Sequence, residues 1–281
     1  MVRLTAMRAP LVAVLGLLAV LACASGHAAP AADLWPRWLA HDPASAGRID
    51  HGEWGAFLVR YLRIGEDGVH RVAYGAVTPS DRARLDRYIA HLSALPISQF
   101  NRAEQMAYWI NLYNALVVRL VVEHYPIASI RDIGSRIGAP GAGPWRQELV
   151  EVEDIPLSLH DIAHRILRPI WRDPRVHYAL SCGAVGCPNL QPEPFEADQL
   201  ERELSEAAMA YVNHSRCITI DGDQLGLSSL FRWYQDDFGG TERDVINHLM
   251  AYAEPGLAMK LQGFDQISGD GFDWRLNDAA P

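Results

Sequence analysis

Lysine is nearly absent from this chain of 281 residues: Lys260 is the only one, and every other basic side chain is an arginine. Acidic residues outnumber Lys and Arg by 34 to 25, so the net charge is −9. Nucleic acids and anionic membranes bind clustered positive charge, so neither is expected as a partner. The preference for arginine is typical of a high-GC bacterial genome.

The chain also lacks a long apolar run, since a membrane span takes roughly 20 such residues. The apolar stretch Leu11–Ala22 has about 12 residues, follows Arg3 and Arg8, and precedes the small residues 25–29. This pattern predicts that residues 1–29 are a signal peptide. We therefore expect an exported, periplasmic protein without a transmembrane segment.

Cysteine is scarce, with four in the chain. Residues 20–23 resemble a lipoprotein box, which offers a lipid tether at Cys23 as an alternative to ordinary signal cleavage. Once Cys23 is removed or lipidated, Cys182, Cys187 and Cys217 remain. An odd number cannot pair completely within one chain, so at least one thiol is expected to be free.

A long helix is predicted over Asn101–Tyr125, where Asn101 is a suitable N-cap, Glu104 completes a capping-box pattern and Pro126 follows the last turn. The middle of this segment is apolar nearly all round, which indicates a buried central helix. Asn111 and Asn114 interrupt that surface on one face. Their amides either tie the helix to a neighbouring loop or line a site.

The remaining pattern predicts a single domain over residues 30–281, with a helical part at 30–99 packed on a core at 100–278. Helices and a few short strands follow one another without regular alternation, which indicates an α+β fold with a small antiparallel sheet. The expected segments after the central helix are strands at 148–152 and 155–157, a helix at 159–168, a strand at 176–180, a helix at 195–213, a hairpin at 216–227, helices at 229–236 and 242–252, and an extended piece at 271–278.

The strand predicted at Val176–Leu180 runs into a glycine-rich loop that holds Cys182 and Cys187. A nucleophilic thiol needs a nearby imidazole, a group that orients that imidazole, and donors for the oxyanion. On a strand, His177 and Cys182 would point to opposite faces, so His164 on the preceding helix is preferred as the base over His177.

Support for such a site would come from polar side chains and from the loop backbone. The candidate orienting groups are Asn111, Asn114, Asp161 and Asp273, and the candidate oxyanion donors are the N–H groups of Gly183, Ala184 and Gly186. Other interpretations stay open: a Cys182–Cys187 disulfide that pins the loop, two buried inert cysteines, or a zinc pair at His160 and His164. No cofactor or metal is expected, and the predicted ligand is a peptide or small molecule.

Five strings together resemble the bacterial and plant "domain of unknown function 547" family: WINLYNAL at 109–116, LSLHDIAHRILR at 157–168, DPRVHYALSCGAVGCPNL at 173–190, LSSLFRWYQDDFG at 227–239 and FDWRLND at 272–278. The resemblance implies a papain-like mixed fold and a Cys–His site. It assigns the family's motif positions to Cys182, Cys187, His177, His164, Asn111 and Asn114. The family's helix usually reads Ile-Glu-His, whereas this chain has Ala163 in the middle position.

The leading hypothesis is a thiol-dependent hydrolase or acyltransferase in which Cys182 is the nucleophile and His164 or His177 the base. The alternative is a non-catalytic binding or scaffold protein that uses the same pocket, and the alanine at 163 favours it. A Cys182–Cys187 disulfide would also favour the binding protein.

Overall fold

The computed structural model describes residues 30–134 and 143–279. The predicted signal peptide and the alternative lipid tether at Cys23 lie outside these residues. Helix far outweighs strand, and the strands form small separate sheets, so the predicted α+β class is confirmed. Within the described ranges, no helix is long and apolar enough to cross a membrane.

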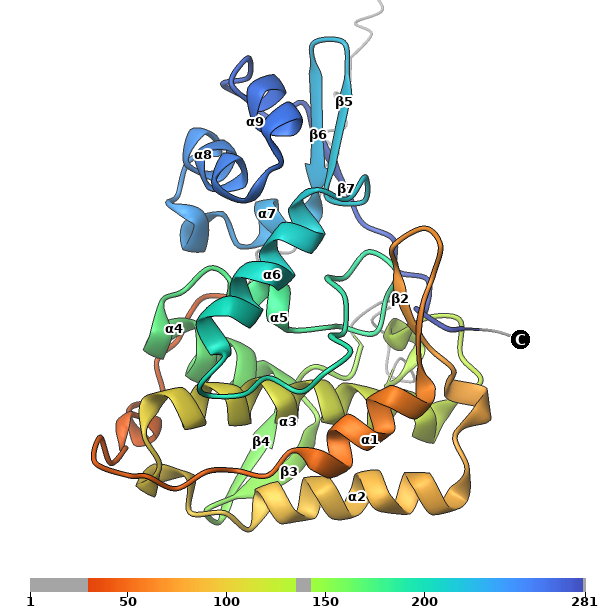
Figure 1. The fold of residues 1–281 in the computed structure, drawn as a ribbon, viewed down its shortest axis with the longest axis vertical. Helices are drawn as coiled ribbons and strands as arrows, with labels where there is room; N and C mark the ends of the chain where they lie inside the picture. Colours follow the sequence, from red (N-terminus) through yellow and green to blue (C-terminus); the bar gives the residue numbers. More distant parts are fainter. Residues whose placement is uncertain (1–29, 135–142, 280–281) are drawn as a thin grey trace, which may run out of the picture.

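The described residues form nine α-helices and seven strands. Figure 1 shows how they are arranged. The helices are α1 Gly52–Tyr61, α2 Pro79–Ser93, α3 Arg102–His124, α4 Arg168–Trp171, α5 Val176–Ala179, α6 Leu200–Val212, α7 Ser229–Trp233, α8 Glu242–Tyr252 and α9 Pro255–Leu261. The strands are β1 Leu62–Ile64, β2 His70–Val72, β3 Glu148–Val152, β4 Ile155–Ser158, β5 Ile218–Asp221, β6 Gln224–Ser228 and β7 Gly269–Gly271. β1–β2, β3–β4 and β5–β6 are antiparallel hairpins, and β7 pairs parallel to β6.

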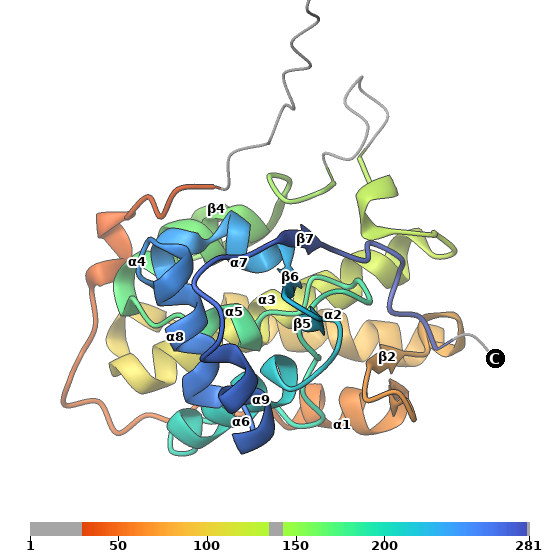
Figure 2. The same ribbon diagram turned by 90° about the horizontal axis from the view of Figure 1, so that it is seen from above.

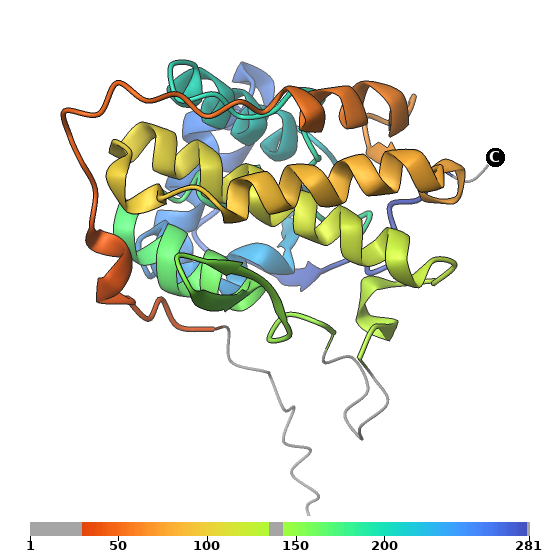
Figure 3. The same ribbon diagram turned by 90° about the horizontal axis from the view of Figure 1, so that it is seen from below.

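The buried central helix is confirmed as α3. Asn101 caps it by accepting the Glu104 N–H at 3.0 Å, but the Glu104 carboxylate binds the N–H of Ile49 instead of completing the capping box. Most of the helix is enclosed because α2 and the π-helix Asp161–Leu167 pack against it. Figure 3 shows α2 and α3 lying side by side.

Two hydrophobic cores stack along the long axis of the molecule. The larger surrounds α3 and includes α1, α2 and the β3–β4 hairpin, while the smaller lies among α6, α8 and the β5–β6 hairpin (Figure 1). α5 lies between them: Val176 and Ala179 belong to the larger core, and Tyr178 to the smaller. His177, between these residues in sequence, therefore lies where the two cores meet.

The strand predicted at 176–180 is wrong, because these residues form the single helical turn α5. The preceding Asp173 and Pro174 form a turn whose carbonyls accept the N–H groups of Val176 and His177. A short apolar run does not distinguish a strand from a buried helical turn, and here the turn decides. The argument that placed His177 and Cys182 on opposite faces therefore no longer applies.

The helix predicted at 159–168 is present, but residues 161–167 have π-helical geometry, and α4 continues to Trp171. Ser158 caps it as expected, by accepting the Asp161 N–H at 3.1 Å, and Asp161 accepts the Ser158 N–H in return. α6 begins at Leu200, five residues later than predicted. α9 and β7 were not predicted.

Candidate functional site

The cysteine loop is closed by a disulfide between Cys182 and Cys187, whose Cα atoms are 5.8 Å apart. Cys187 is buried, whereas Cys182 is partly exposed. Gly183 has φ +75°, a value that few other residues adopt without strain, and it turns the chain back towards Cys187. The Ala184 N–H then points at the Cys187 Sγ, 3.3 Å away. Both loop sulfurs are thus bonded to each other, and among the described residues Cys217 is the free cysteine, buried in the smaller core.

Backbone hydrogen bonds hold the same loop against the C-terminal segment. Val185 and Gly186 donate to the carbonyls of Arg275 and Asp273, both at 2.8 Å. The segment follows β7, which lies beside α7 in Figure 2. Two of the three proposed oxyanion donors, Ala184 and Gly186, are therefore engaged. The N–H groups of Gly183 and Cys182 have no acceptor among the described residues.

Asn111 and Asn114 tie α3 to two different chain segments. The Asn111 amide donates to the Phe195 carbonyl and accepts the Phe195 N–H, at 2.8 and 3.0 Å. The Asn114 amide donates to the Ala179 carbonyl and accepts the Ser181 N–H, both at 2.9 Å. Asn114 therefore fixes the joint between α5 and Cys182, whereas Asn111 fixes the approach to α6.

His177 makes a hydrogen bond with a carboxylate that sequence reasoning did not select. Its Nε2 lies 2.6 Å from Asp237 Oδ2. Burial lowers the pKa of His177 despite the nearby carboxylate, so the ring is neutral near pH 7. Because the carboxylate can only accept, Nε2 carries the ring hydrogen and Nδ1 has a free lone pair. His177 thus has the tautomer of a general base with an orienting aspartate.

Asp237 is fixed in turn by Arg168, whose guanidinium reaches both carboxylate oxygens. Burial acts to raise the pKa of Asp237, but the hydrogen bonds from His177 and Arg168 outweigh it and hold that pKa well below its usual range. Arg168 is itself 7% exposed. The carboxylate is therefore ionised at neutral pH and held in place from two sides.

His164 lies on the other side of Arg168. The Arg168 Nη1 is 3.0 Å from His164 Nδ1, and the guanidinium also contacts the ring of Tyr234, with 4.7 Å to the centroid. Tyr234 stacks between the two histidines, 5.7 Å from His164 and 4.3 Å from His177. We call His164, Arg168, His177, Tyr234 and Asp237 the histidine cluster.

Of the other predicted residues, Asp161 and Asp273 make their hydrogen bonds away from this cluster, whereas His160 packs against its edge. The Asp161 carboxylate binds Ser158 and Arg165, and the Asp273 carboxylate binds Arg275. The His160 ring packs 4.9 Å from that of His164, but no group of three or more His, Cys, Asp or Glu in the described residues could hold a metal ion. Asp237, which the His177 ring contacts, lies in the string at 227–239, three residues after Tyr234.

Ala163 faces the larger core and is 5% exposed. A glutamate at this position would bring a carboxylate into apolar surroundings, where it would need a buried partner. In this chain, the carboxylate that serves the cluster comes from Asp237, on a different segment.

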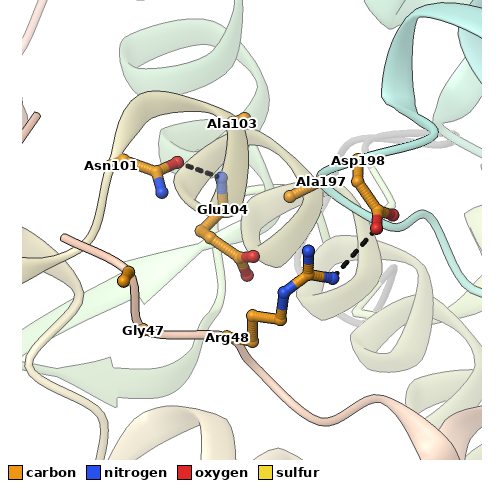
Figure 4. A pocket seen from close by; sticks show the side chains of 8 residues that line it. Gly47, Arg48, Asn101, Ala103, Glu104, Ala197 and Asp198 are labelled. Carbon is orange, nitrogen blue, oxygen red and sulfur yellow. Dashed lines mark hydrogen bonds and ion pairs between the residues drawn. The ribbon is translucent and has the colours of Figure 1, made fainter. Parts of the chain in front are cut away.

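A surface hollow lies away from the cluster, between the start of α3 and the segment before α6 (Figure 4). Its polar lining includes Arg48, which pairs with Asp198 at 2.9 Å, and the Asn101 cap of Glu104. Arg48 and Asp198 thus pair with each other, and the Glu104 carboxylate binds the Ile49 N–H, so the charged groups of the hollow already have partners.

The fold and site together define an α+β protein in which a buried helix fixes a disulfide-closed loop and a carboxylate orients a neighbouring histidine. Residues 97–212, less than half of the chain, match the model of the family described as "Protein of unknown function, DUF547". No curated protein and no solved structure matches the chain. The predicted resemblance to this family is therefore confirmed over the matched residues, and the papain-like arrangement stays a prediction.

The matched range contains α3, the π-helix and the cysteine loop. It ends at Val212, so Tyr234 and Asp237 lie beyond it, as do the two C-terminal strings assigned to the family on resemblance. The histidine cluster is thus assembled from matched residues and from the segment that follows them.

Proposed function

We propose that the protein is an exported, thiol-dependent hydrolase or acyltransferase, with Cys182 as the nucleophile and His177 as the base. The observation that carries the proposal is the His177–Asp237 hydrogen bond, which leaves Nδ1 unprotonated. His177 thereby replaces His164 as the preferred base. The described structure corresponds to the oxidised form, in which Cys182 is bonded to Cys187.

Activity requires reduction first. A dithiol supplies two electrons and two protons to the Cys182–Cys187 bond and becomes a disulfide itself. His177 Nδ1 then takes the proton of the Cys182 thiol as sulfur attacks the acyl carbon. The bond from that carbon to the leaving oxygen or nitrogen breaks, and His177 returns the proton to the leaving group. Water, or a second nucleophile in a transferase, releases the acyl group from sulfur.

Two further features support this assignment. The Cys182 and Gly183 N–H groups have no acceptor among the described residues, so they are available to an oxyanion beside the sulfur. Asn114 holds the backbone on both sides of Leu180, which fixes where Cys182 begins its loop.

The proposal is tested by treating the reduced protein with p-nitrophenyl acetate and mapping the acetylated residue by mass spectrometry. We expect one acetyl group on Cys182, none in Cys182→Ser, and a rate about 100-fold lower in His177→Gln. Cys217→Ser is the matched control, since burial raises the pKa of that thiol well above its usual value. Acetylation that is absent, or unaffected by His177→Gln, overturns the proposal.

The second candidate is a binding or scaffold protein, and the disulfide is the observation that favours it, because a bonded Cys182 cannot attack a carbonyl. Ala163 also favours this candidate, because it replaces the glutamate that the family's helix usually has at this position. This reading predicts that the bond resists a mild dithiol and that reduced protein is not acetylated. Rapid reduction followed by Cys182 acetylation contradicts it.

A further inference from the structure

The two histidines of the cluster have different hydrogen-bonding partners. His177 Nε2 faces a carboxylate, whereas His164 Nδ1 faces the Arg168 guanidinium at 3.0 Å. A guanidinium has five N–H donors and no acceptor. The nitrogen that faces it must therefore be unprotonated.

It follows that a neutral His164 carries its hydrogen on Nε2. Burial, with the charge of Arg168, holds the pKa of His164 well below its usual value, so the ring stays neutral at physiological pH. The charged and titratable groups around it are Arg168, His160, His177 and Asp237, and the first three all disfavour its protonation. Because its one basic nitrogen is occupied, His164 cannot serve as a base.

The remaining polar atoms of the stacked rings are open. His164 Nε2, the Tyr234 hydroxyl and His177 Nδ1 have no hydrogen-bond partner among the described residues, and none belongs to the fully buried atoms that lack one. Two of these groups can donate, and His177 Nδ1 accepts. A ligand that complements these groups has an acceptor oxygen for the two donors, close to the hydrogen that His177 removes.

We infer that His164 is a catalytic hydrogen-bond donor, which presents Nε2–H to the acyl oxygen of the substrate, while His177 is the base. This inference rests on the proposed function. A neutral imidazole that stays a donor at every working pH stabilises negative charge developing on a carbonyl oxygen. Arg168 is the positioning residue for both rings, since it fixes Nδ1 of His164 and the carboxylate that fixes His177.

The first arm of the test reads the tautomers in substrate-free protein labelled with ¹⁵N-histidine. Long-range ¹H–¹⁵N spectra should show His164 neutral at pH 7 with its hydrogen on Nε2, and the signal is assigned by its loss in His164→Gln. A hydrogen on Nδ1, or a protonated ring at pH 7, overturns the inference whether or not the protein is active.

The second arm measures Cys182 acetylation by p-nitrophenyl acetate in two variants. His164→Gln keeps a donor near the Nε2 position, and His164→Phe keeps a ring against Tyr234 without a donor. We expect a fall of about 100-fold in His164→Phe and at most about tenfold in His164→Gln. Equal rates in the two variants overturn the inference. If wild type is not acetylated although His164 carries its hydrogen on Nε2, the proposed function is overturned. The acyl oxygen is then also excluded as the group that His164 binds.

Discussion

At the scale of single residues, the two buried asparagines of α3 are alike in all but their partners. Both are almost fully buried, at 0% and 2% exposed, and each satisfies one backbone N–H and one carbonyl. Asn111 serves Phe195, whereas Asn114 serves the joint that leads to Cys182. The spacing in the sequence identifies the pair but cannot say which segment each amide meets, because the partners are 65 to 84 residues away.

The pair gives a matched experiment. Asn111→Ala and Asn114→Ala should each lower the free energy of unfolding by about 2 to 4 kcal/mol, since each leaves two buried backbone groups without a partner. In the reduced protein, only Asn114→Ala should change the rate at which iodoacetamide alkylates Cys182. Urea unfolding and mass spectrometry measure the two effects. An equal change of alkylation rate in both variants would show that Asn114 has no special part in placing the thiol.

At the scale of elements, the sequence predicted most accurately the helix whose own residues mark both its ends and its buried middle. The cap, the apolar middle and the closing proline located α3 to within one residue at each end. α5 was missed because a short, mostly apolar run fits a strand or a buried helical turn equally well, and the turn at Asp173 and Pro174 decides between them. No feature of the sequence at 161–167 predicts the π-helical geometry found there.

The cysteine loop should keep its conformation when its disulfide is removed. A closed loop of about six residues contributes roughly 2 kcal/mol through chain entropy, so Cys182→Ser/Cys187→Ser should lose about that much stability. The bonds from Val185 and Gly186 to the C-terminal segment remain. Hydrogen exchange should therefore still protect these two amides, with reduced wild type as the control. Loss of their protection would mean that the disulfide alone shapes the loop.

At the scale of the whole molecule, the candidate site joins segments that are distant in sequence. Sequence reasoning selected Cys182, His177, His164 and Asn114, since each stands out locally as a thiol, an imidazole or a polar residue on an apolar surface. It did not select Asp237 or Arg168, because acidic and basic residues are common on surfaces, and only the fold shows that these two are paired and largely buried.

Acid should destabilise the fold through its buried histidines. Burial lowers the pKa of His51 and of His248 to about 4, and that of His177 below its usual value. The unfolded chain therefore binds protons that the native state does not, so stability is full above about pH 6.5 and falls towards pH 4. His51 alone accounts for at most about 3 kcal/mol.

Thermal or urea unfolding from pH 7 to pH 4 measures this loss. His51→Asn, which keeps a partner for the Tyr88 hydroxyl, should reduce the pH dependence of the free energy of unfolding by about one proton. An acid slope that is the same in His51→Asn as in wild type would contradict the burial argument for this residue.

The central claim is that His177, oriented by Asp237, activates Cys182 once the disulfide is reduced. The most direct test is the pH dependence of iodoacetamide alkylation at Cys182 in reduced protein, compared between wild type and His177→Gln. We predict fast alkylation near neutral pH in wild type, with an apparent pKa below the ordinary thiol value of about 8.5, and a return to that value in His177→Gln. Slow alkylation with an ordinary or raised pKa, identical in both proteins, would contradict the claim.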